Sequence, residues 1–185
     1  GRILAMAQNR VFDQTQNPPP GHTSVNYAAD KNYGGSSGFQ SGSTYKIFTL
    51  AAWLNKGYKL LDHVDGRIRE WNASDFSARC GSLVGTWAPK NIAKEPEDVT
   101  VVQATAISEN TAFANMASQL DLCDIRDLAL AFGVKRADGT ELQYVPSSIL
   151  GVNEISPLSM AVAQAGVSNQ GVTCSPVAID RVVVR

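Results

Sequence analysis

The chain has 185 residues, of which 44% are hydrophobic and 18% are charged. This composition is enough for one sizeable core, and nothing in it predicts two complete domains. The formal net charge is −1 and no run of Lys or Arg occurs, which argues against a nucleic-acid partner. No apolar run approaches the ~20 residues that a membrane-spanning helix requires.

Both ends of the sequence predict strands. The chain opens on Gly1 and a strand-like run over residues 2–7, and it closes on another over residues 179–185. Natural domains more often begin and end on polar, frayed residues. We therefore expect both ends to be cuts through a longer polypeptide.

The first half of the chain predicts one clear helix. A turn-rich stretch over residues 8–42 is expected to form a long loop. The helix follows over about residues 44–55, where an apolar face is present and Gly57 is placed to end it. The segment over residues 58–94 is expected to be irregular.

Helical signals return at Thr100 and continue through the next twenty residues. Thr100 and Gln103 have the spacing of a capping box, which predicts a helix up to Ile107. Apolar residues at core-facing intervals predict a second helix over residues 111–120.

Two further helices are predicted from their end signals. Asp124 is placed as the N-cap of one, and Gly133 lies just past its end. Ser156 and Pro157 open the other as a polar cap followed by proline, and that helix should continue to about Val167. The architecture is therefore helix-rich, with a strand at each end.

The three cysteines, Cys80, Cys123 and Cys174, are far apart and form no CxxC or Cys/His pattern. A zinc site is therefore not expected, and no other metal or cofactor is indicated. An odd count allows one disulfide with one remaining thiol, or none, and three small buried side chains fit equally well. The sequence leaves the disulfide state open.

Ser43-Thr44-Tyr45-Lys46 is the first candidate for chemistry. Ser43 lies where a Gly-rich loop becomes a helix, so unpaired N–H groups and the helix dipole favour negative charge there. Lys46 shares its helix face, and an amine half-buried on that apolar helix would have a lowered pKa and could accept the serine proton. The pattern alone also fits an ordinary N-cap followed by a solvated lysine.

Ser108-Glu109-Asn110 is the second candidate. It forms the short joint between two predicted helices, from which a hydroxyl and an amide can project into a cleft. Ser24-Val25-Asn26 matches the same pattern in the Pro-rich loop, without a helix beside it. Taken alone, Ser108 and Asn110 are more simply explained as local helix caps. A Ser-His-Asp triad that uses His63 is a further alternative, although nothing in the sequence places His63 near Ser43.

Together these motifs resemble the signature of penicillin-binding proteins and serine β-lactamases, which consists of S-x-x-K, S-x-N and K-T-G elements. Residues 39–50 resemble the penicillin-binding block with its Gly-Ser-Thr-aromatic-Lys core. Residues 1–6 resemble the strand that opens the transpeptidase domain, and residues 99–113 and 156–179 resemble its later blocks in the right order. The resemblance covers essentially the whole chain and is closest to the bifunctional, class A proteins of actinobacteria.

The resemblance implies an α+β fold of the penicillin-binding protein/serine β-lactamase type, in which a helical cluster packs on an antiparallel sheet. Residues 1–185 would form a partial transpeptidase domain. A glycosyltransferase domain would lie upstream, and further sheet strands would follow downstream. The parent protein would be membrane-anchored at the extracytoplasmic face of the bacterial cell membrane.

The implied function is that of a peptidoglycan D,D-transpeptidase, with β-lactam antibiotics as inhibitors and no nucleic-acid partner. Ser43 would attack the D-Ala-D-Ala carbonyl of a stem peptide, and Lys46 would take its proton. Ser108 would relay the proton to the leaving amine, and Asn110 would hydrogen-bond the substrate backbone. A D,D-carboxypeptidase or β-lactamase-type hydrolase and a non-catalytic β-lactam sensor domain are the alternatives.

The sequence departs from the family pattern because it contains no Lys-Thr-Gly triplet. In the family this triplet lies on a strand that binds the substrate carboxylate, beside a backbone N–H of the oxyanion hole. Losing one oxyanion donor typically costs ~10²–10³ in rate. We therefore expect the isolated chain to be poorly folded or nearly inactive.

Overall fold

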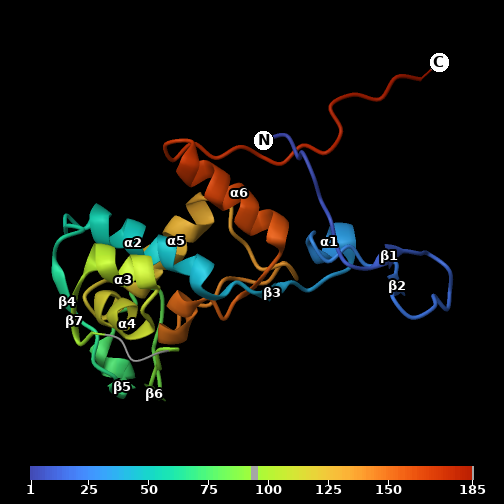
Figure 1. The fold of residues 1–185 in the computed structure, drawn as a ribbon. Coiled ribbons are helices and arrows are strands. Elements are labelled where there is room, and N and C mark those ends of the chain that lie inside the picture. The colour runs from blue at the N-terminus through green and yellow to red at the C-terminus, as the bar shows by residue number, and fades with distance from the viewer. Residues whose placement is uncertain (93–95, 185) are drawn as a thin grey trace. The chain divides into compact units, whose positions relative to one another are not determined.

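The computed structural model describes residues 1–92 and 96–184 (Figure 1). The chain forms two compact units that interleave along the sequence. Unit 1 comprises residues 1–39 and 130–141 together with the chain from residue 154 onward, and unit 2 comprises residues 40–129 and 142–153. Both sequence motifs, S-x-x-K and S-x-N, therefore lie in unit 2.

Unit 2 is built around a buried central helix, α4 (Asn110–Ser118). This helix contacts α2 (Lys46–Asn55), β4 (His63–Asp65), α3 (Val101–Ile107) and the 3-10 helix η3 (Pro146–Leu150). Six of its nine residues are buried, which is typical of a helix enclosed by other elements. The start of α4, which carries Asn110, thus belongs to a helix that is held by contacts on several sides.

The helices of unit 2 largely match the sequence prediction. The 3-10 helix η1 (Gly42–Tyr45) leads directly into α2, where one helix over about 44–55 was predicted. The capping box of Thr100 and Gln103 is present at the start of α3. α4 begins one residue before the predicted start and ends two residues before the predicted end. Local caps and apolar periodicity were sufficient to place these helices.

The predicted N-cap at Asp124 is wrong. α5 (Leu122–Ala131) begins two residues earlier, and the Asp121 carboxylate accepts a hydrogen bond from the Cys123 N–H at 2.8 Å. Asp124 lies in the first helical turn, where a carboxylate is favoured by the helix dipole. Gly133 follows the end of α5 with φ +80°, which agrees with its predicted place.

The segment predicted to be irregular contains short strands. β4 pairs antiparallel with β7 (Asp98–Thr100), and β5 (Trp71–Asn72) pairs antiparallel with β6 (Thr86–Trp87). Trp71, Phe76 and Trp87 pack together, with ring centroids 5.4 and 6.1 Å apart, beside the short 3-10 helix η2 (Ala73–Asp75). Strands of two or three residues are too short for a period-two pattern to reveal them. Residues 93 and 94 of this segment lie outside the described residues.

Unit 1 combines one long helix with short elements. α6 (Pro157–Ser168) begins as predicted, with the Ser156 hydroxyl accepting from the Ser159 N–H. β1 (Val11–Phe12) pairs parallel with β2 (His22–Thr23) within the predicted long loop. Unit 1 also contains α1 (Lys31–Gly34), β3 (Phe39–Gln40), which ends in unit 2, and β8 (Glu154–Ile155).

The two terminal strands predicted from the sequence are not formed. Arg2 makes only an isolated parallel bridge to Val177, and no strand occurs over residues 179–184; Arg185 lies outside the described residues. The apolar residues of the last segment are exposed, Val184 to 89%. A β-rich sequence forms a strand only where a partner strand supplies hydrogen bonds, and this segment has none among the described residues.

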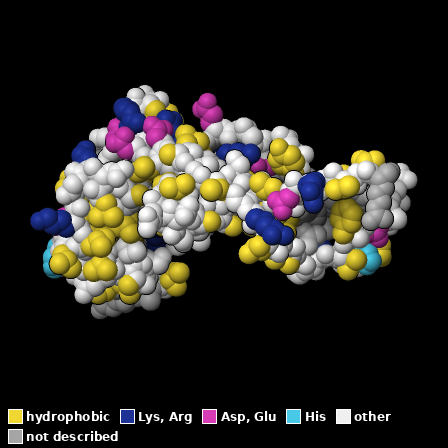
Figure 2. Space-filling model, turned by 90° about the horizontal axis from the view of Figure 1, so that it is seen from above, with side chains coloured by type: hydrophobic (Ala, Val, Ile, Leu, Met, Phe, Trp, Pro, Cys, Tyr) yellow, Lys and Arg dark blue, Asp and Glu magenta, His cyan; other side chains and the backbone are white. Residues whose placement is uncertain are grey.

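The described structure is therefore an α+β arrangement of helices with small, mostly antiparallel sheets, and its strands pair only in twos. Hydrophobic side chains remain exposed on its surface, as the face in Figure 2 shows. Among the described residues, no helix has the length and apolar character that crossing a membrane requires.

Candidate active site

The amine of Lys46 is the centre of the candidate site. Lys46 is the first residue of α2, and it is only 4% exposed. Its Nζ donates to the Ser108 carbonyl oxygen at 2.5 Å and lies 3.0 Å from the Ser108 hydroxyl. It also donates to Oδ1 of Asn110 at 2.6 Å. The fold thus brings together three of the four site residues predicted from the sequence.

These contacts suit a general base. Two of the three oxygens around Nζ belong to carbonyl groups, which accept hydrogen bonds but cannot donate them. The three oxygens match the three N–H donors of a lysine ammonium, and the Ser108 hydroxyl is the one of the three that could also donate to the amine once it is neutral. The Phe113 ring lies 5.3 Å from Nζ and would favour the ammonium that forms when the amine takes up a proton.

Ser43 lies one helical turn before this amine. It belongs to η1, and its carbonyl accepts a hydrogen bond from the backbone N–H of Lys46. The Ser43 residue is exposed, whereas Lys46 is buried, so a substrate can approach the hydroxyl from solvent. The S-x-x-K spacing predicted that Lys46 would approach the Ser43 hydroxyl; the structure places the two residues one turn apart, with the hydrogen bonds described for the amine directed to Ser108 and Asn110.

The loop before Ser43 is held by a close contact between two glycines. The Gly42 N–H donates to the Gly151 carbonyl at 3.0 Å. A Cβ atom at Gly151 would lie 2.2 Å from the Gly42 carbonyl oxygen, and Gly151 has φ +81°. Only glycine fits this position, so η3 can pack closely against the chain that presents Ser43.

Ser108 adopts a left-handed conformation, with φ 57° and ψ 43°, at the end of α3. Such a conformation is uncommon for a residue other than glycine and often occurs at functional sites. Here it turns the chain so that the hydroxyl and the carbonyl of one residue both face Lys46. The Ser108-Glu109-Asn110 joint therefore orients these two groups toward Lys46 in addition to linking the two helices.

Asn110 begins α4, and both ends of its amide are engaged. Oδ1 accepts from Lys46, and Nδ2 donates to the Lys90 carbonyl at 2.8 Å. The matching pattern at Ser24-Val25-Asn26 lacks this environment, because Asn26 Oδ1 accepts from the Ala28 N–H and Asn26 Nδ2 contacts the Met6 sulfur. Of the two Ser-x-Asn motifs, only Ser108-Glu109-Asn110 contacts Lys46 in the described structure.

The residues around Asn110 were not identified from the sequence. Glu109 and Thr111 are 0% and 1% exposed, and Thr111 Oγ1 lies 3.1 Å from Glu109 Oε1. The side chain of Asn91 bonds to Thr111. Nothing in the local sequence indicates these contacts, since Asn91 and Thr111 lie twenty positions apart in segments of different structure.

Tyr45, between the serine and the lysine, belongs to the hydrophobic core. It is 1% exposed and packs edge-on against Phe48 with ring centroids 5.0 Å apart. Burial raises the pKa of the Tyr45 hydroxyl well above its ordinary value, so it remains a neutral phenol. Its role is to fix the first turn of α2.

His63 has the carboxylate partner of a catalytic triad, but among the described residues its ring makes no hydrogen bond to a serine. Its Nδ1 lies 3.0 Å from Asp98 Oδ1 across the β4–β7 pair, and both side chains are exposed. The group beside the Ser108 hydroxyl is the Lys46 amine.

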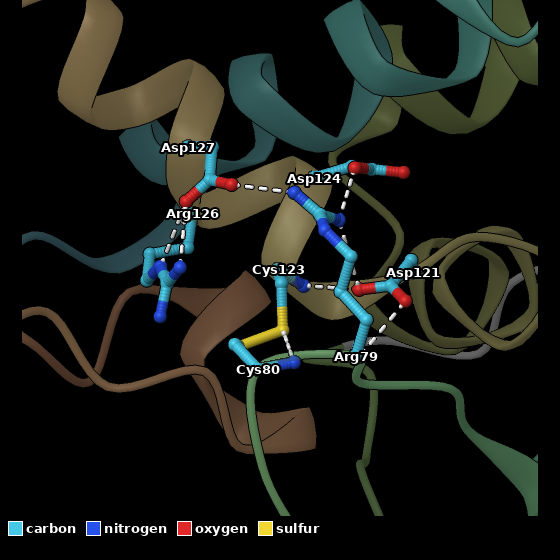
Figure 3. The surroundings of a disulfide bond; sticks show 7 residues. All are labelled: Arg79, Cys80, Asp121, Cys123, Asp124, Arg126 and Asp127. Atoms are coloured by element: carbon cyan, nitrogen blue, oxygen red, sulfur yellow. Dashed lines mark hydrogen bonds and ion pairs between the residues drawn. A yellow bond between two sulfur atoms is a disulfide. The ribbon is translucent and has the colours of Figure 1, made fainter.

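Cys80 and Cys123 form a disulfide in unit 2 (Figure 3). Beside it, the Arg79 guanidinium pairs with three carboxylates, those of Asp121, Asp124 and Asp127. Cys174 is a free, exposed thiol. Among the described residues, no group of three or more His, Cys, Asp or Glu side chains is placed to hold a metal ion.

The candidate site thus consists of an exposed serine, a buried lysine one turn later, and a Ser-x-Asn joint whose side chains contact that lysine. The model of the penicillin binding protein transpeptidase domain matches residues 1–184, and the chain belongs to this family. A comparison with curated proteins gives no match.

Solved structures show the same fold at low sequence identity. The chain is similar to the penicillin-binding protein PonA1 from Mycobacterium tuberculosis, with TM-score 0.62 and 20% identity over 82% of this chain and 38% of that one. It is also similar to penicillin-binding protein 1A from Haemophilus influenzae, with TM-score 0.67 and 23% identity over 84% of this chain and 21% of that one. An imipenem acyl-enzyme complex of penicillin-binding protein A from M. tuberculosis matches with TM-score 0.58 and 20% identity, over 80% of this chain and 35% of that one. The chain thus spans well under half the length of each.

Proposed function

We propose that the chain carries the serine-nucleophile part of a peptidoglycan D,D-transpeptidase of the class A, bifunctional type. The observation that carries the proposal is the triple contact of the buried Lys46 amine with Ser108 and Asn110, one helical turn after the exposed Ser43. Membership of the penicillin-binding transpeptidase family supports serine acyl-transfer chemistry at this site.

In the proposed reaction, Ser43 Oγ attacks the carbonyl carbon between the last two D-Ala residues of a stem peptide. The serine proton passes to the Lys46 amine, an ester bond to Ser43 forms, and the C–N bond to the terminal D-Ala breaks. The leaving amine takes the proton through the Ser108 hydroxyl, which lies 3.0 Å from Nζ. Asn110 hydrogen-bonds the substrate backbone. An amino group of a neighbouring stem then attacks the ester, which forms the cross-link and restores the serine.

β-Lactams are the proposed inhibitors, because they would acylate Ser43 while the amine released by ring opening stays attached to the acyl group. Similar structures are described as acyl-enzyme complexes with imipenem and with penicillin G. These complexes support the proposal through the shared fold.

We also propose an extracytoplasmic location for the parent protein, with an anchor in the bacterial cell membrane. The Cys80–Cys123 disulfide supports an oxidising compartment, since disulfides are rare where cellular thiols keep cysteines reduced. A glycosyltransferase domain upstream is part of the same proposal.

Labelling with a fluorescent penicillin tests the nucleophile. In the full-length protein, we expect one covalent adduct, located on Ser43 by mass spectrometry and abolished in Ser43→Ala. Ser24→Ala, in the second Ser-x-Asn pattern, is the matched control and should label normally. Labelling that survives Ser43→Ala would refute the assignment.

The fate of the acyl group distinguishes the alternatives. A transpeptidase passes the acyl group of a stem-peptide substrate to an added amino acceptor, so the cross-linked product should accumulate with acceptor concentration. Release only to water would identify a D,D-carboxypeptidase or β-lactamase-type hydrolase. An acyl group that stays on Ser43 without turnover would identify a sensor domain.

The 185 residues contain no Lys-Thr-Gly triplet, and we propose that efficient acylation requires one. We expect residues 1–185 alone to react with penicillin at least ~10²-fold more slowly than a longer chain that includes such a triplet, the effect typical of one lost oxyanion donor. Equal rates would show that the triplet is dispensable.

A further inference from the structure

We propose that Asn91 is a positioning residue that fixes the orientation of the Asn110 amide and thereby the place of the Lys46 amine. The proposal rests on the proposed function, because it gives Asn91 a part in acylation of Ser43. The Asn91 side chain hydrogen-bonds to Thr111 and not to Ser43 or Lys46, so its effect passes through the start of α4.

The two ends of the Asn110 amide meet groups of opposite kind. Oδ1 accepts from the Lys46 amine, and Nδ2 donates to the Lys90 carbonyl. Rotating the amide by half a turn would place N–H against N–H and carbonyl oxygen against carbonyl oxygen, so both contacts would be lost. The Lys90 carbonyl therefore selects the orientation in which the amide oxygen faces Lys46.

The Lys90 carbonyl is held in place by the next residue. Asn91 Oδ1 accepts from the Thr111 N–H at 3.1 Å, and Asn91 Nδ2 donates to the Thr111 hydroxyl at 2.9 Å. Consecutive residues of one segment thus bind consecutive residues of α4. Because two such links fix both distance and register, Asn91 sets where the Lys90 carbonyl lies.

The partner of Asn91 is itself rigidly placed. Thr111 is 1% exposed, and its hydroxyl donates to the Gly66 carbonyl at 2.5 Å. A Cβ atom at Gly66 would lie 2.1 Å from Glu109 Oε1, so the chain at Gly66 packs directly on the buried Glu109 side chain. On the other side Pro89 is buried, and its ring restricts the backbone just before Lys90. Asn91 therefore links a restrained segment to a buried helix start.

The test compares variants of the full-length protein. Stopped-flow kinetics with a fluorescent penicillin separates the dissociation constant of the first complex from the acylation rate constant. We expect Asn91→Ala to lower the acylation rate constant of the folded protein by roughly 10- to 100-fold, the size of effect that a misplacement of about 1 Å produces. Thr111→Val should act similarly, and Thr111→Ser, which keeps the hydroxyl, should restore most of the rate.

Two controls separate positioning from general stability. Asn169→Ala removes an exposed side-chain bond of the same type, to the Val172 carbonyl, and should leave the rate constant unchanged. The double variant Asn91→Ala/Thr111→Val should lose less rate than the product of the two single effects, because the bond between the Asn91 amide and the Thr111 hydroxyl is removed by both substitutions. A wild-type rate constant in Asn91→Ala, or a loss that only follows the unfolded fraction, would overturn the proposal.

A second measurement is independent of acylation. The NMR signal of the Asn110 side-chain amide should move and exchange faster with solvent in Asn91→Ala, but not in Asn169→Ala. If this change occurs while wild-type Ser43 is never labelled, the positioning role stands and the proposed function fails. If Ser43 is labelled and the amide signal does not respond to Asn91→Ala, the positioning role fails and the proposed function stands.

Discussion

At the scale of single residues, Ser108 meets two requirements at once. Its hydroxyl lies beside Lys46, and its left-handed backbone turns α3 into the short joint before α4. A residue with a Cβ atom costs roughly 1–2 kcal/mol in this conformation, a cost that glycine avoids. Serine thus places a hydroxyl beside Lys46 at a position where glycine would be more stable, which fits the proposed proton relay.

Two substitutions at Ser108 separate these requirements. Ser108→Gly and Ser108→Ala both remove the hydroxyl of the proposed proton relay, and we expect each to lower the rate of Ser43 acylation by roughly 10²–10⁴-fold. Ser108→Gly should be more stable than Ser108→Ala by about 1 kcal/mol, because glycine accepts the positive φ. Urea denaturation measures the second effect. Equal stabilities of the two variants would show that the left-handed turn is not retained. An acylation rate equal to that of the wild type in either variant would show that Ser108 does not relay the proton.

At the scale of elements, the disulfide joins α5 to the loop that follows η2. Cys80 and Cys123 are 43 positions apart, and the neighbouring Arg79 brings three further contacts to α5 and the residue before it. A cross-link between distant parts of the chain stabilises the fold mainly by reducing the freedom of the unfolded chain. The ion pairs are partly exposed, so each contributes little by itself.

Removing this disulfide should destabilise unit 2. We expect Cys80→Ala/Cys123→Ala to lower the free energy of unfolding by about 2–4 kcal/mol. Thermal or urea unfolding under oxidising conditions measures the change. Cys174→Ala is the matched control, because that thiol is exposed and unbonded, and it should have no effect. An unchanged stability in the double variant would mean that the cross-link does not form in solution.

At the scale of the whole molecule, unit 1 leaves much apolar surface open. It has a groove of about 770 Å³ whose lining includes Ile3, Met6 and Leu158. Near the end of the described chain, Ile179, Val182 and Val184 are 71%, 76% and 89% exposed. Contiguous exposed apolar surface promotes association between molecules.

We therefore expect the 185-residue chain to self-associate with rising concentration. The substitutions Val182→Lys and Val184→Lys together should reduce association in sedimentation velocity experiments, since charge opposes pairing of exposed apolar segments. They should leave the unfolding temperature unchanged, because both side chains are exposed. An unchanged association constant would place the contact elsewhere on the molecule.

The sequence alone determined the helices whose signals are local. The capping box at Thr100 and the Ser156-Pro157 start were sufficient, because caps act within one turn of the chain. The motifs also identified Ser43, Lys46, Ser108 and Asn110 as the candidate site, and the fold brings the last three into contact.

Only the tertiary structure decided what depends on partners distant in the chain. The terminal segments have the composition of strands but form none, since a strand needs a neighbour to complete its hydrogen bonds. The pairing of Cys80 with Cys123, and of Asn91 with Thr111, likewise follows from packing between separate segments, and no local pattern encodes it. Helix caps depend on residues within one turn of each other, so the sequence predicts them. The contacts of Lys46 involve residues more than sixty positions away, and they form only when the helices of unit 2 pack together.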